Sequence, residues 1–122
     1  YDVGLTNKTE ADGMAVARMS AFVAKVMREM LAGVYTAADD DLFKLLRMAW
    51  ITQRQKLEPS AAAALLGPDF LLRHSEGRRF QAEQGIEEKK MSRATHVLWT
   101  TGGSFVPEEQ FQNLLRQAEA RA

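Results

Sequence analysis

Apolar residues recur at intervals of three and four in three separate stretches of this 122-residue chain, and this period predicts amphipathic α-helices. The first stretch begins after a capping residue, Thr9, and ends at Gly33, which can adopt a left-handed conformation. The second is capped by Thr36 and ends by about Leu57, because a proline follows. The third begins at Pro107, a residue favoured at the first helical position. The pattern therefore predicts an all-α fold.

The segments between these stretches bring the expected number of helices to about five. Only a few residues separate Gly33 from Thr36, so the first two helices are expected to pack as an antiparallel hairpin. Further helix is predicted over residues 61–66, 69–84 and 87–94. The result is a small helical bundle that starts with a helical hairpin.

Residues 96–106 allow two interpretations. Residues prone to form strands lie on both sides of Gly102-Gly103, and this arrangement favours a short β-hairpin. The alternative continues the preceding helix as far as Trp99. Because a two-stranded hairpin alone is only marginally stable, we favour the helix.

Composition limits the class of protein. The length indicates a single domain over residues 1–122, and the absence of cysteine excludes disulfides and thiolate chemistry. Residues 1–4 show no leader pattern, and the longest apolar run, 61–66, is too short to span a bilayer. A cytoplasmic, membrane-free protein is expected. The formal net charge of zero predicts no strong attraction to nucleic acid or anionic lipid.

The sequence contains no motif that assigns a chemical reaction. His74 and His96 are the only histidines, and neither has a second ligand at helical spacing, so no metal site is predicted. The glycine turn at 102–104 resembles an anion site, but Glu108 and Glu109 follow it and would repel a phosphate. We therefore expect no enzyme, no cofactor and no small-molecule ligand. An enzyme with a site centred on either histidine is a third alternative, because catalytic geometry does not require sequence spacing.

The width of the apolar face on the first helix supports the leading functional hypothesis. One neighbouring helix would not cover that face, so a second copy of the chain or another protein is expected to bind it. The chain is then a non-catalytic, regulatory protein-interaction module that forms a homo-oligomer through its N-terminal helices. The predicted interface residues are Met19, Phe22, Val23, Val26 and Met30.

The alternative hypothesis is a DNA-binding regulator with a degenerate helix-turn-helix over residues 60–80. An alanine-rich helix and a turn at Gly67 resemble the first half of that motif, whereas Pro68, Arg73 and Glu76 occupy positions where apolar anchors are expected. Residues 41–98 contain ten Lys/Arg and seven Asp/Glu, a weak basic excess. The predicted nucleic-acid contacts are Arg73, Arg78, Arg79, Lys89, Lys90 and Arg93.

Overall fold

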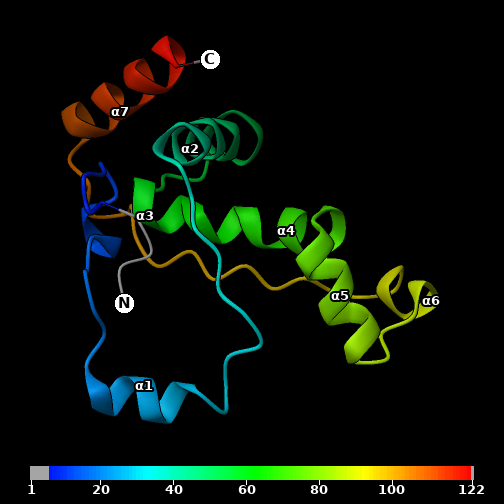
Figure 1. The fold of residues 1–122 in the computed structure, drawn as a ribbon. Helices are drawn as coiled ribbons and strands as arrows, with labels where there is room; N and C mark the ends of the chain where they lie inside the picture. The colour runs from blue at the N-terminus through cyan, green and yellow to red at the C-terminus, as the bar shows by residue number, and fades with distance from the viewer. Residues whose placement is uncertain (1–5, 122) are drawn as a thin grey trace.

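The computed structural model describes residues 6–121, and within that range it contains helices and no strand (Figure 1). The all-α prediction is confirmed. None of the helices described is long and apolar enough to cross a membrane. The expectation of no leader over residues 1–4 lies outside the described residues. The α-helices are α1 (Ala21–Met27), α2 (Asp39–Gln53), α3 (Pro59–Ala62), α4 (Gly67–Arg73), α5 (Ser75–Glu83), α6 (Glu88–Met91) and α7 (Glu108–Ala120), and the 3₁₀ turns are η1 (Asp12–Met14) and η2 (Ala63–Leu66).

The core lies where α2, α3 and α7 meet (Figure 1). Leu46, Ala62 and Phe111 are fully buried there, one from each helix. The Phe111 ring meets Trp50 edge to face, with ring centroids 5.2 Å apart. This geometry is favourable because the positive ring edge faces the negative ring surface. The predicted apolar faces of the second and last helices are confirmed.

Helix α2 is shorter at both ends than predicted. It begins at Asp39 rather than after a Thr36 cap, and it ends at Gln53, several residues before Leu57. Arg54 has a left-handed backbone, with φ of 54°, and this conformation stops the helix. The chain then turns back so that Leu57 is buried against Ala49 and α3. Burial of Leu57, rather than the following proline, explains the early end.

The predicted antiparallel hairpin of the first two helices is wrong. Helix α1 has only seven residues, none of them buried, and it contacts no other helix of the described region (Figure 1). Its N-cap is Ser20, whose hydroxyl accepts a hydrogen bond from the Val23 N–H. Thr9 caps no helix, because its hydroxyl bonds to the Asp39 carboxylate instead. Periodicity alone does not lengthen a helix that lacks a packing surface.

Neither interpretation of residues 96–106 is correct. Helix α6 ends at Met91, and the chain then crosses the molecule without helix or strand before α7 begins (Figure 1). The expected turn at Gly102-Gly103 lies against residues 56–58 rather than between two strands. Packing against that distant segment determines the conformation here.

The predicted helix-turn-helix is also absent. Gly67 has φ of −51° and begins α4, so helical backbone continues through the place where the turn was expected. Pro68 suits this position because an early helical residue needs no N–H partner. The chain bends instead at His74, whose ψ is 148°. Gly77 then lets α5 approach α4 closely, since a Cβ there would lie 2.5 Å from the Leu71 carbonyl oxygen.

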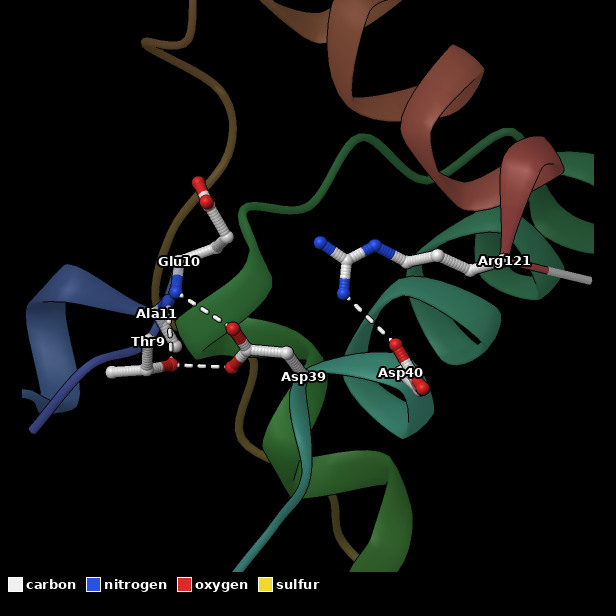
Figure 2. A network of polar contacts seen from close by, with 6 residues as sticks. All are labelled: Thr9, Glu10, Ala11, Asp39, Asp40 and Arg121. Atoms are coloured by element: carbon white, nitrogen blue, oxygen red, sulfur yellow. Dashed lines mark hydrogen bonds and ion pairs between the residues drawn. The ribbon is translucent and has the colours of Figure 1, made fainter. Parts of the chain in front are cut away.

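A polar network joins the N-terminal segment and α7 to the start of α2 (Figure 2). The Asp39 carboxylate accepts hydrogen bonds from the Thr9 hydroxyl and from the Glu10 N–H, at 2.9 Å. Asp40 forms an ion pair with Arg121 at 2.9 Å. The Thr9 hydrogen bond, followed by that from Glu10, lowers the pKa of Asp39. The ionised carboxylate is therefore stabilised in the folded state.

Asp39→Asn is expected to reduce the pH dependence of stability below about pH 4. Because the folded pKa of Asp39 is below the ordinary value of 3.8, its contribution is complete above that value and disappears as pH falls through the folded pKa. The substitution should cost about 1 kcal/mol at pH 7, typical of a partly exposed hydrogen bond. Thermal unfolding of the protein at stepped pH measures both effects. Asp41→Asn is the matched control, and an equal response of the two variants would contradict the prediction.

Candidate functional site

The tightest crossing of distant segments brings Gly102 and Gly103 against residues 56–58. The Glu58 N–H donates a hydrogen bond to the Gly102 carbonyl oxygen at 3.4 Å. A Cβ at Gly102 would lie 2.8 Å from Glu58 Oε2, so a larger residue there would displace this carboxylate. Gly103 has φ of 133°, and a Cβ there would lie 2.6 Å from the Leu57 Cα. The glycine turn therefore lies directly against the backbone at the start of α3.

A cavity of about 610 Å³ opens beside this crossing. Its walls come from the N-terminal segment, the start of α3, the glycine turn and the start of α7. Among residues 6–121, three carboxylates line it and no lysine or arginine does, so its charge favours a cationic or neutral polar ligand. The lining residues are Thr9, Glu10, Asp12, Glu58, Pro59, Thr101, Gly102, Gly103, Phe105, Val106, Pro107, Gln110 and Leu114.

A second cavity, of about 410 Å³, is lined mainly by α4, α5 and residues 32–35. Tyr35 stacks on Phe70 with centroids 4.9 Å apart and donates a hydrogen bond to the Ala63 carbonyl at 2.8 Å. Burial raises the pKa of Tyr35. His74 packs against the other end of this aromatic group, with its ring centroid 4.3 Å from that of Phe70. Aromatic packing therefore accounts for the position of His74.

The predicted interface residues are all solvent-exposed. Met19, Phe22, Val23, Val26 and Met30 lie on α1 or beside it, with exposed fractions from 43% to 77%. Exposure is compatible with an interface, although the helical hairpin that was expected to present these residues is absent. Their role as an interface stays a prediction.

The predicted nucleic-acid contacts are dispersed and partly neutralised. Arg73 forms an ion pair with Asp69 at 3.2 Å. Arg79 forms ion pairs with Glu76 and Glu83. Arg78 and Lys90 donate hydrogen bonds to backbone carbonyls, and Lys89 and Arg93 lie exposed around α6. Carboxylates among these cations weaken the attraction of the surface for a phosphate backbone.

Comparison with known proteins gives a strong similarity that covers nearly the whole chain. A protein of Rhizobium leguminosarum bv. trifolii is 94% identical over 120 residues, which are 98% of this chain and 27% of that protein. A protein of Rhizobium etli is 90% identical over 122 residues, and one of Sinorhizobium medicae is 59% identical over 120, each again covering 27% of the relative. All three are named probable D-serine dehydratase. No family model matches the sequence.

The chain spans about a quarter of the length of these relatives, and the similarity corrects the functional predictions. Relatives named for an enzymatic activity contradict a non-catalytic interaction module, and they equally contradict a DNA-binding regulator and the expectation of no enzyme. The feature whose long-range contact was missed is the glycine turn at 102–104. Its contact with Glu58 joins positions 44 residues apart, and no local pattern reveals such a contact.

Proposed function

We propose that the full-length protein containing this chain is a D-serine dehydratase and that this chain forms one wall of its active site. The observation that carries the proposal is the 94% identity over 120 residues with a probable D-serine dehydratase. Identity this high leaves few positions at which a reacting group could differ. The 59% identity of the Sinorhizobium medicae relative extends the same relationship to a more distant sequence.

The part of the active site that we assign to this chain is the lining of the cavity beside Glu58. Dehydration of D-serine breaks the bond from Cα to hydrogen and the bond from Cβ to the hydroxyl, giving 2-aminoacrylate, which hydrolyses to pyruvate and ammonia. The substrate carries an ammonium group, a carboxylate and a hydroxyl group, and we assign this acidic cavity to its ammonium and hydroxyl groups. The three carboxylates of the cavity attract the ammonium group, and the hydroxyl of Thr101 offers a hydrogen bond to the substrate hydroxyl. Glu58 is the carboxylate that lies against Gly102, and its backbone N–H donates a hydrogen bond to the Gly102 carbonyl oxygen.

The reaction implies a cofactor, which the sequence alone does not suggest. Removal of the α-proton leaves a carbanion, and pyridoxal phosphate is the usual electron sink for such carbanions in amino-acid chemistry. The cavity does not fit the phosphate of that cofactor. The glycine turn is occupied by Glu58 and by the Lys56 carbonyl, and α7 begins with Glu108 and Glu109. We therefore assign the phosphate to no residue of this chain.

Pyruvate production from D-serine by the purified full-length protein tests the proposal. We expect D-serine to be consumed and L-serine to react much more slowly. Glu58→Gln should lower kcat/KM by about ten- to a hundredfold, the effect of losing one charge-assisted hydrogen bond. Glu109→Gln is the matched control, since this exposed carboxylate lies outside the cavity.

The two parts of the proposal fail in different ways. No pyruvate from D-serine would overturn the function. Normal activity of Glu58→Gln, in a protein that otherwise turns over D-serine, would overturn only the assignment of this cavity. Melting temperatures of both variants show whether a loss of activity comes from unfolding.

A further inference from the structure

Residues 95–101 include three consecutive large apolar side chains that the described chain leaves exposed. Val97 and Trp99 are 87% and 82% exposed, and Leu98 between them is 38% exposed. Single exposed apolar residues are common on protein surfaces, but three consecutive large ones in a non-helical segment are not. The segment crosses the molecule between α6 and the glycine turn (Figure 1). A substantial apolar strip is therefore left open to solvent.

The backbone of this segment is equally without partners. Within residues 6–121, no N–H or carbonyl of residues 95–101 takes part in a backbone hydrogen bond. The segment is rich in β-branched and aromatic residues, the types enriched in strands: Thr95, Val97, Trp99, Thr100 and Thr101. Strand-forming residues with unpaired backbone groups are a template for pairing with another strand.

We infer that residues 95–101 form a strand of a β-sheet whose other strands lie in the part of the full-length protein outside this chain. The inference rests on the longer protein proposed above, and not on its substrate. This chain spans about a quarter of the length of its relatives, so about three quarters of such a protein remains to cover the segment. Pairing on both edges satisfies the backbone, and burial on both faces explains consecutive apolar residues.

The rest of the same polypeptide is better suited to cover residues 95–101 than a second copy of the chain. A tethered segment meets its partner strand at a high effective concentration, without the entropic cost of bringing two molecules together. The position of the strand also has a consequence for the cavity. Thr101 ends the segment and lines the cavity beside Glu58, so sheet pairing would hold that wall in place.

Hydrogen–deuterium exchange of the full-length protein tests the inference without any substrate. Amides of residues 95–101 are expected to exchange at least about a hundredfold more slowly than in an unstructured chain, because sheet hydrogen bonds protect them. Exchange at the unstructured rate would overturn the inference. Protection that disappears when the protein is diluted to a monomer would overturn it as well, by showing that a second copy covers the segment.

A pair of substitutions at Val97 gives an independent measurement. Val97→Asp is expected to lower the melting temperature of the full-length protein or prevent folding, whereas Val97→Ile should retain stability. A solvent-exposed position would tolerate both changes. Equal stability of the two variants would therefore overturn the inference. Slow exchange in a protein that does not turn over D-serine would overturn the proposed function but would still support the inferred strand.

Discussion

Gly103→Val in the full-length protein is expected to destabilise the fold by about 3 kcal/mol or more and to abolish turnover of D-serine. The φ of 133° at Gly103 belongs to a region that side-chain-bearing residues rarely adopt. A Cβ there would also collide with the Lys56 carbonyl and lie 2.6 Å from the Leu57 Cα. The backbone of residues 56–58 must then move, and Glu58 moves with it. Thermal unfolding and pyruvate production measure the two losses.

Gly85→Val is the matched control for this substitution. Gly85 also has a positive φ, of 60°, but no atom lies within 4 Å of the position that its Cβ would occupy. This variant should lose about 1–2 kcal/mol from backbone conformation alone and keep its activity. If Gly103→Val were no more damaging than Gly85→Val, the close crossing would not be structurally important.

Phe111→Ala is expected to lower the free energy of unfolding by about 3–5 kcal/mol, the usual cost of removing a fully buried phenylalanine. Phe111 is 0% exposed and forms the centre of the contact between α2 and α7. The substitution removes the edge-to-face contact with Trp50 and leaves a cavity between the helices. The melting temperature of the full-length protein, which is about four times as long as this chain, should fall by about 3 °C or more.

Phe111→Leu is the graded comparison, because it removes less apolar volume than Phe111→Ala does. Leucine fills much of the same space, so its cost should be clearly smaller than that of alanine. A melting temperature unchanged by Phe111→Ala would mean that α7 does not stabilise α2 in the whole protein. The expected order of stability is therefore wild type, then leucine, then alanine.

The helices that were predicted well are those whose local signals agree with their tertiary contacts. Helix α7 begins one residue after Pro107 and buries Phe111 and Ala118 as its periodicity indicates. Helix α2 likewise buries Leu42, Phe43, Leu46 and Ala49. In both helices the apolar face meets another apolar face of the same chain, so the packing reinforces the propensity.

In the first predicted helix, the local signals are not matched by tertiary contacts. Its apolar period is as regular as that of α2, yet only Ala21–Met27 is helical and none of those residues is buried. Periodicity shows which residues would share a face, but it does not show whether a surface exists to cover that face.

The candidate site depends on contacts that no local pattern contains. Glu58, Gly102 and Thr9 come from three distant parts of the chain and meet at one cavity. No spaced motif connects them, and each has an ordinary local interpretation as a cap, a turn or a surface residue. Sequence reasoning therefore missed the site although it singled out the glycine turn.

The amino-acid sequence by itself determined the helical class, the places of α2 and α7 and the residues that these two helices bury. These properties follow from hydrogen bonding and side-chain spacing within a few turns of one helix. Only the tertiary structure decided where α2 ends, that α1 stands apart and that Gly102 supports Glu58. Those outcomes depend on which distant segments pack together, because burial and steric exclusion act between residues that are close in space and far apart in sequence.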